Sequence, residues 1–208
     1  MNRPRLRRAV AIATNTPLRT VMSIQQDMTS VCVITPQLCY RGQMATRGYR
    51  VADVLIDGRT DQLELRDVTA RTLGPDPSEI RFDAISLRKD RILMVVLTGK
   101  HEAPIRRGNN YVEKVRYGAI ATLPGYILSG ILHLSPHATA STLLCDNATV
   151  DSFLGVTEVQ VHSAVHPVVP PDAKVVVIRR RCIEAVQLSA DPLPKRKSAL
   201  LVQNSTSS

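Results

Sequence analysis

Apolar residues occur along this chain in short runs, many alternating with polar residues and most ended by proline, glycine or polar clusters. Such two-residue alternation is typical of β-strands with one buried face. Residues 50–57 differ, because positions 51, 54 and 55 have the i, i+3, i+4 spacing of a helical turn, which residues 139–144 repeat. We therefore predict an all-β protein with short helical turns. Its strands are expected at residues 31–35, 38–46, 63–72, 80–87 and 91–97, and again at 118–123, 126–134, 153–162, 174–178 and 182–188.

The two sets of strands come from an internal repeat. Shifted by 88 positions, Val31–Gly42 lie over Ala119–Gly130, and Val68 lies over Val156. We place a three-residue slip in the later proline-containing loop, after which the spacing is 91. Five short strands in about 70 residues suit a small bent barrel, because closure protects sheet edges, and glycine allows sharp strand bends. The expected fold is therefore two duplicated five-stranded barrels with flexible termini.

The net charge of +9 is concentrated at the ends of the chain. Residues 1–28 hold five arginines and one aspartate, and residues 192–208 hold three basic residues and no acid, which leaves +2 between them. We interpret these ends as basic, disordered segments that act as electrostatic tethers. The body is predicted to hold one barrel at residues 29–100, a linker at 101–117 and a second barrel at 118–191.

Composition also bears on the compartment. No apolar run reaches the roughly 20 residues that span a bilayer, and the N-terminal stretch lacks the long apolar core of a secretory signal. That stretch is rich in arginine, as a transit peptide is, or the chain begins at Met22 or Met28; both interpretations stay open. Four cysteines without a Cys-x-x-Cys pair favour buried free thiols in a reducing compartment. We therefore expect a cytoplasmic protein.

The last hairpin of each copy has a shared motif. Residues 85–95 (Ile-Ser-Leu-Arg-Lys-Asp-Arg-Ile-Leu-Met-Val) and 176–186 (Val-Val-Ile-Arg-Arg-Arg-Cys-Ile-Glu-Ala-Val) alternate apolar side chains on both sides of an arginine-containing turn. This motif resembles the second signature of Sm-like proteins, and Gly42 and Gly130 resemble part of the first. The chain departs from that family where Lys89 replaces the expected turn glycine and where residues 43–62 replace a tight loop. The strands also resemble a bacterial family of small β domains, which implies a fold and no activity.

If the Sm-like resemblance extended to function, it would imply that the turn arginines Arg88 and Arg179 contact RNA. Lys89, Arg180 and Arg181, beside them in the same turns, are further candidates for nucleic-acid binding. The opposing interpretation is that exposed hairpin turns tolerate basic residues without a binding role. We favour the second, because the body is nearly neutral and phosphate binding needs a cationic surface. The aromatic content of 3%, without tryptophan, also leaves few side chains on which bases could stack.

Histidines and aspartates are the remaining candidates for chemistry in the sequence. His133, His137, His162 and His166 have i, i+4 spacing in pairs, which would place two zinc ligands on one helical face. Their surroundings predict strands and proline loops instead, so we predict no metal site, although neighbouring strands could bring His133 near His162. Three aspartates at positions 53, 57 and 61 are interpreted as the solvated face of the short helix.

Known catalytic signatures are missing from the sequence: it has no Gly-x-Ser-x-Gly, no phosphate-binding loop and no dinucleotide fingerprint. We predict a non-enzymatic binding or scaffold protein without cofactors or a small-molecule substrate, whose partner is a protein or a second copy of itself. The alternative is a nucleic-acid-binding protein that uses the basic ends and the turn arginines. A third interpretation is a metal-dependent hydrolase built on the histidines of the second copy.

Overall fold

The computed structural model describes residues 27–99, 114–145, 152–163 and 173–193, and most of these residues lie in strands. The strands are β1 (Met28–Ile34), β2 (Leu38–Ala45), β3 (Gln62–Thr72), β4 (Glu79–Arg88), β5 (Met94–Leu97), β6 (Val115–Leu123), β7 (Tyr126–Leu134), β8 (Phe153–Ser163), β9 (Val175–Arg179) and β10 (Ala185–Leu188). The prediction of a mainly β protein is confirmed. Within the described ranges, no helix has the length and apolar character needed to cross a bilayer.

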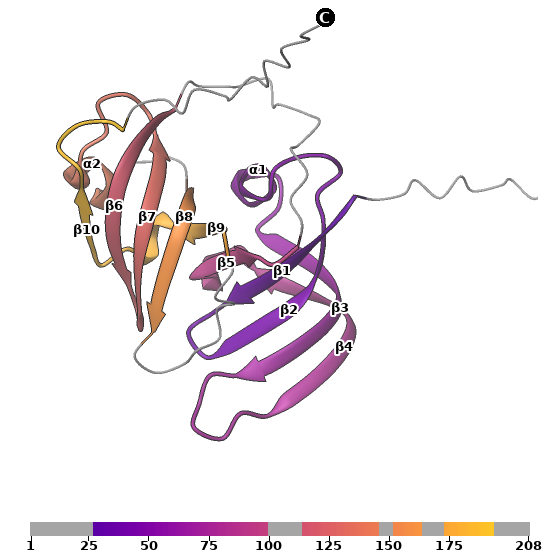
Figure 1. The fold of residues 1–208 in the computed structure, drawn as a ribbon. Helices are drawn as coiled ribbons and strands as arrows, with labels where there is room; N and C mark the ends of the chain where they lie inside the picture. Colours follow the sequence, from indigo (N-terminus) through magenta and orange to yellow (C-terminus); the bar gives the residue numbers. More distant parts are fainter. Residues whose placement is uncertain (1–26, 100–113, 146–151, 164–172, 194–208) are drawn as a thin grey trace, which may run out of the picture.

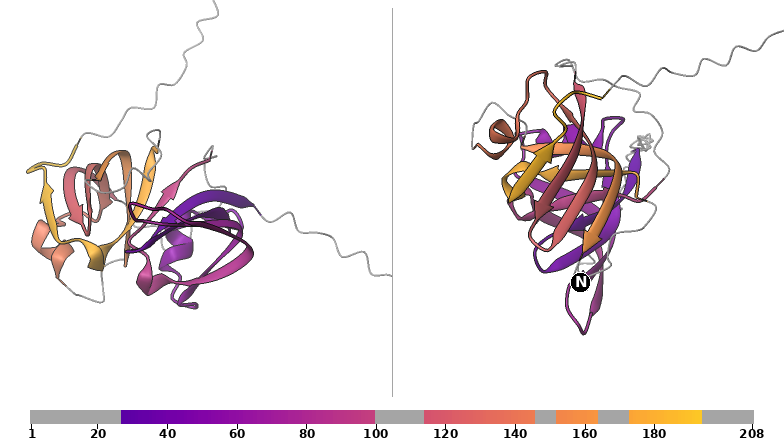
Figure 2. Two further views of the ribbon diagram at one scale, coloured as in Figure 1. Left: turned by 90° about the horizontal axis from the view of Figure 1, so that it is seen from below. Right: turned by 60° about the vertical axis from the view of Figure 1, so that its left-hand side comes forward.

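All ten strands belong to one antiparallel sheet, in the order β10-β6-β7-β8-β9-β5-β1-β2-β3-β4. Strands β1–β5 form one half and β6–β10 the other, and β5 and β9 meet between them (Figure 1). Their register pairs Met94 with Ile178, Val95 with Val177 and Val96 with Val176. Further views of the two halves are shown in Figure 2. We call residues 28–97 the first repeat and residues 115–188 the second repeat, because their elements follow the same order.

The prediction of two separate closed barrels is not confirmed. The sheet is open, with β4 at one end and β10 at the other. The physical reason lies at β5, which pairs with β1 of its own repeat on one side and with β9 of the second repeat on the other. Because this edge of β5 is occupied by β9, it cannot pair with β4 to close the first repeat.

A glycine allows the sheet to bend in each repeat. The β2–β3 register shifts around Gly42, and the β7–β8 register shifts around Gly130, as in a β-bulge. A Cβ on Gly42 would lie 2.8 Å from the carbonyl oxygen of Arg66, and one on Gly130 would lie 2.9 Å from that of Thr157. Any larger residue would displace the facing backbone, so the predicted bends at both glycines depend on the missing side chain.

The bulges also locate the three-residue slip between the repeats. Opposite them lie Asp67 and Glu158, which share positive φ values of 50° and 52° and are 91 positions apart. The spacing therefore changes from 88 to 91 before β3 and β8, not in the later proline-containing loop. The structural counterpart of Val68 is consequently Val159, and the predicted overlay of Val68 on Val156 is wrong. The identical pairs Val68-Thr69 and Val156-Thr157 favoured the spacing of 88, whereas the structural counterpart of Thr69 is Gln160.

Within the described residues, two short α-helices and two 3-10 helices connect the strands. Helix α1 (Val51–Ile56) and helix α2 (Ala140–Leu144) follow the second strand of each repeat, as predicted. The 3-10 helices η1 (Lys89–Arg91) and η2 (Arg180–Cys182) form the turns of the shared motif and connect β4 to β5 and β9 to β10. The prediction that these strands form hairpins is wrong, because β4 pairs with β3 and not with β5, and β9 pairs with β8 and β5 and not with β10. These turns therefore have a defined backbone conformation, and their side chains point to fixed neighbours.

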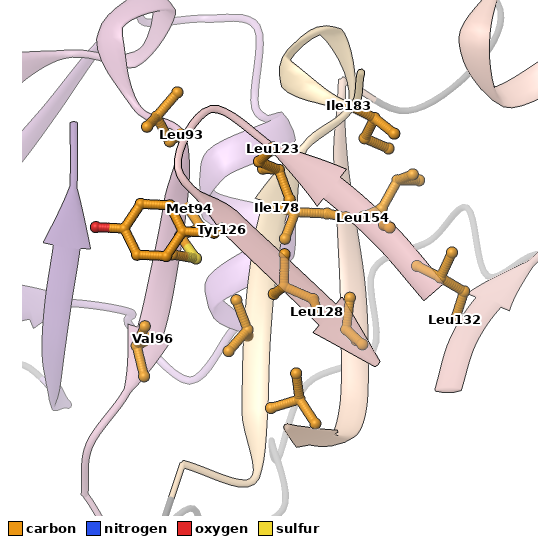
Figure 3. Close-up of a cluster of buried hydrophobic side chains, with 14 of the residues drawn as sticks. Leu93, Met94, Val96, Leu123, Tyr126, Leu128, Leu132, Leu154, Ile178 and Ile183 are labelled. Carbon is orange, nitrogen blue, oxygen red and sulfur yellow. The ribbon is translucent and has the colours of Figure 1, made fainter. Parts of the chain in front are cut away.

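The apolar core crosses the junction between the repeats in both directions. The core cluster of the first repeat includes Phe153 and Val177 from the second repeat. The core cluster of the second repeat includes Met94 and Val96 of β5, which lie near Leu128 and Ile178 in Figure 3. Each repeat thus completes part of the other's core, which fixes their relative position.

Candidate functional site

The turns that follow β4 and β9 hold the predicted basic residues, and Lys89 is the first of these that the structure places. This lysine is only 8% exposed, which is unusual for its residue type. Its Nζ donates hydrogen bonds to the carbonyl oxygens of Val54 at 3.0 Å and Asp57 at 2.8 Å. The last carbonyl groups of a helix lack partners within the helix, so Lys89 satisfies the C-terminal end of α1.

Arg180 has the same position and the same role in the second repeat. It lies 91 positions after Lys89 and is 6% exposed. Its Nη1 donates a hydrogen bond to the carbonyl oxygen of Cys145, the C-cap residue of α2. Cys145 in turn lies 88 positions after Asp57, whose carbonyl accepts from Lys89. The duplication has therefore preserved a cation that holds the short helix against the 3-10 turn.

A second set of contacts links the two repeats directly. Arg88 pairs with Asp90 through two contacts, Nε to Oδ1 at 3.1 Å and Nη2 to Oδ2 at 2.6 Å. The main-chain carbonyl of Asp90 accepts a hydrogen bond from Nη1 of Arg179, which belongs to β9 of the second repeat. Arg181 is exposed in η2. Arg88, Lys89, Arg179 and Arg180 thus make specific contacts with the protein itself.

Beside these contacts lies an open pocket of about 290 Å³ between the repeats. The first repeat contributes most of its lining, including Asp57, Asp61 and Lys89, and the second contributes Phe153 and Arg179. Burial lowers the pKa of Lys89, and the carboxylates of Asp57 and Asp61 oppose part of that effect. A hydrogen bond from the backbone N–H of Arg59 lowers the pKa of Asp57. The pocket is therefore lined by both acids and cations, and its cations already have partners.

Two buried thiols lie close together on the face of the first repeat that meets the second. The Sγ atoms of Cys32 in β1 and Cys39 in β2 are 2.7 Å apart. The hydrogen bond between them and burial both raise the pKa of Cys32. Burial likewise raises the pKa of Tyr126, from the second repeat, to about 12. The expected buried free thiols are present at these two positions, whereas Cys145 is exposed.

The candidate histidines do not come together. His133 is half-buried in β7, where its Nε2 lies 2.9 Å from Oγ1 of Thr157. His162 lies opposite Ile127, which precedes His133 by six residues in β7, a separation of about 20 Å at about 3.3 Å per residue. His137 is exposed after β7, and His166 lies outside the described residues. Among the described residues, no three His, Cys, Asp or Glu side chains form a group that could hold a metal ion.

Sequence reasoning missed two features of the junction. The structural role of Lys89 and Arg180 was missed, although the repeat alignment places a cation at the same position of both turns. The pairing of β5 with β9 was also missed, although Val31–Ile34 and residues 92–97 are continuous apolar runs, which are typical of strands covered on both faces. The sequence therefore indicated that these strands are covered on both faces, but it did not indicate which strands cover them.

Comparison of the chain with models of known protein families, with curated proteins and with solved structures found no match. The resemblance to Sm-like proteins therefore stays a prediction.

Proposed function

We propose that this protein is a non-enzymatic binding or scaffold protein that presents the combined surface of its two repeats to a protein partner. The observation that carries the proposal is the way the junction uses its basic residues. Lys89 and Arg180 are buried against backbone carbonyls, and Arg179 bonds the backbone of the other repeat. A phosphate-binding surface needs cations that reach the ligand, whereas a scaffold needs repeats held in a fixed position.

The acidic residues of the junction support the same proposal over RNA binding through the turns. Asp57, Asp61 and Asp90 lie around the pocket and would repel a phosphate backbone. Arg88 is already paired with Asp90. Nucleic-acid binding through the basic ends of the chain stays the alternative, since both ends lie outside the described residues.

The first test measures binding of single-stranded RNA by fluorescence anisotropy across a salt series. One full-length variant combines Arg88→Ala with Arg181→Ala. A second replaces Lys195, Arg196, Lys197 and the four arginines within residues 1–8 with serine. We expect any RNA binding by the wild type to be lost in the second variant and to change less than about two-fold in the first. A ten-fold or larger loss in the turn variant would favour RNA binding by the folded body.

The second test identifies the kind of partner. A photoreactive phenylalanine derivative replaces Thr60, an exposed residue that lines the pocket, and Asp76 on a distant loop serves as the matched control position. We expect adducts at position 60 that resist ribonuclease and are removed by protease. Adducts removed by ribonuclease would contradict the proposal, and equal labelling at position 76 would mean that the junction is not the binding surface.

A further inference from the structure

The two ends of the sheet are structural counterparts of the two strands that form its centre. Strand β10 corresponds to β5, and β4 corresponds to β9, each at a spacing of 91. Within the described residues, β10 pairs only with β6 and β4 only with β3. Each end of the sheet therefore has an unpaired strand edge that is equivalent to one of the two strands paired at the β5–β9 junction. An unpaired strand edge is a template for pairing with another chain.

We propose that β4 of one copy of this chain pairs with β10 of a second copy, in the geometry of the β5–β9 junction. This inference rests on the proposed scaffold function and adds a second copy of the chain as a partner, bound at the ends of the sheet and not at the junction pocket. The internal register predicts the intermolecular one: Val186 pairs with Ser86, as Val95 pairs with Val177. Ala185 then lies opposite Leu87, and Gln187 lies opposite Ile85.

The backbone of β4 has the orientation that this pairing requires. In the second repeat, the N–H of Arg180 bonds Ser152 within the repeat, whereas that of Arg179 bonds Leu93 across the junction. In the first repeat, the N–H of Lys89 bonds Asp61, the counterpart of Ser152. Because successive N–H groups of a strand point to opposite sides, those of residues 88 and 86 face away from β3. These N–H groups can donate hydrogen bonds to the backbone carbonyl oxygens of a β10 strand.

Exposed apolar side chains on β6 and β7 occupy the positions of a face that is buried in the first repeat. Cys32 and Cys39 are 0% and 1% exposed, because the second repeat covers them. Their counterparts, 88 positions later, are Ile120 and Ile127, which are 48% and 49% exposed. Large exposed aliphatic side chains at the positions of a buried pair indicate that another protein surface covers this face of β6 and β7, as the second repeat covers β1 and β2.

The opposite end of the sheet has the matching feature. Phe82 in β4 is 41% exposed, and its counterpart Ala173 is 9% exposed within the core cluster that spans the junction. Ile80, two residues before Phe82, is 59% exposed. If the junction geometry repeats, the first repeat of one copy lies against β6 and β7 of the next. Its exposed apolar residues then meet Ile120 and Ile127.

Other differences predict a weaker contact than the internal junction. Phe153 and Val177 insert into the core of the first repeat, but their counterparts in the first repeat are Gln62 and Ser86. The association between copies should therefore be reversible, unlike the permanent junction within the chain. Because the contact joins two different surfaces, it repeats from copy to copy and gives a closed ring or an open filament.

The experiment measures the mass of the full chain by sedimentation equilibrium over a concentration series. We expect species at multiples of 22.9 kDa for the wild type. Ser86→Pro removes an N–H that faces away from β3, so it should weaken association by about ten-fold or more without breaking the β3–β4 ladder. Ser86→Ala keeps that N–H and is the matched control, which should associate as the wild type does.

A second variant, Ile120→Lys with Ile127→Lys, blocks the other surface at exposed positions. Each blocked variant alone should be largely monomeric. Mixed together, they should form a one-to-one dimer and nothing larger, because each supplies the surface that the other lacks. Retention of wild-type masses by both variants, or a mixture that stays monomeric while the wild type associates, would overturn the proposal.

A wild type that stays monomeric at all concentrations would also overturn it. Hydrogen exchange would then separate two causes. Protected amides at residues 86 and 88 would mean that another segment of the same chain covers β4, and unprotected amides would mean that the edge is free but does not pair. Neither result bears on the scaffold function, which depends on the adducts at position 60 and on RNA binding. Conversely, RNA binding by the turn residues would reject the scaffold function and leave the mass measurements unchanged.

Discussion

The two repeats share a framework but differ in what covers them. Positions that each repeat buries within itself are apolar in both, as with Leu55 and Leu143 or Leu63 and Leu154. Several positions at the junction differ in polarity: Phe153 is buried, whereas its counterpart Gln62 is polar and exposed. Residues of the first kind are determined by the fold of one repeat. Those of the second kind depend on the neighbour, so the divergence between the copies marks the contact surface.

The comparison predicts its largest effect at Phe153. Phe153→Ala should lower the free energy of unfolding by about 3–5 kcal/mol, because it leaves a cavity in the core of the first repeat. Gln62→Ala, at the equivalent exposed position, should change it by less than about 0.5 kcal/mol. Urea unfolding of the full-length variants measures both values. Equal effects at the two positions would mean that the junction contributes little to stability.

The sequence predicted the elements of this fold well because each one depends on local chemistry. Alternation and short apolar runs located the ten strands of the described residues, and the 51, 54, 55 spacing located α1. Gly42 and Gly130 marked the bends, since only the absent side chain permits the close approach of the facing strand. These properties are visible in a few consecutive residues.

The assembly of the elements was not predictable in the same way. Met94–Val96 pair with residues 176–178, far away in the chain, and an apolar run reports that a strand is covered but not by which strand. Each repeat was therefore expected to close on itself. The contacts of Lys89 were missed for a related reason, because its two acceptors are backbone carbonyls of α1, which no side-chain pattern reveals.

The next effect concerns the cations that close the short helices. Lys89→Met should lower the free energy of unfolding by about 1.5–3 kcal/mol, because two buried carbonyl groups lose a charged donor. Arg180→Met should have a comparable effect in the second repeat, if the two cations have the same role. Arg181→Met, next to it but exposed, is the control and should change stability by less than about 0.5 kcal/mol. Urea unfolding with intrinsic tyrosine fluorescence follows all three variants. A neutral Lys89→Met would contradict a structural role.

A smaller effect is expected where the two thiols meet. Cys39→Ile introduces, at a buried position of the first repeat, the residue type that the second repeat has at the equivalent position, Ile127. With the Sγ atoms 2.7 Å apart, the larger side chain has no room, and overpacking should cost about 1–3 kcal/mol of stability. The reverse change, Ile127→Cys, occurs on an exposed face and should leave the stability of the single chain within about 0.5 kcal/mol. Thermal unfolding at low protein concentration compares the two. An unchanged stability of Cys39→Ile would mean that the β1–β2 face of the first repeat has room for isoleucine, as the exposed β6–β7 face of the second repeat does.

The smallest effect is a pH dependence confined to the second repeat. Burial, with Arg116, Lys114 and Arg50, lowers the pKa of His133 below its usual value near 6.5, and Glu158 opposes this shift. The unfolded chain therefore takes up this proton at a higher pH than the folded chain does. Below about pH 6.5, stability should fall with decreasing pH by at most about 1.4 kcal/mol per pH unit from this group. His133→Ala introduces the residue that the first repeat has at position 45, and it should flatten the slope between pH 7.5 and 5.5. The exposed His162→Ala is the control, and an unchanged slope in His133→Ala would assign the dependence to other groups.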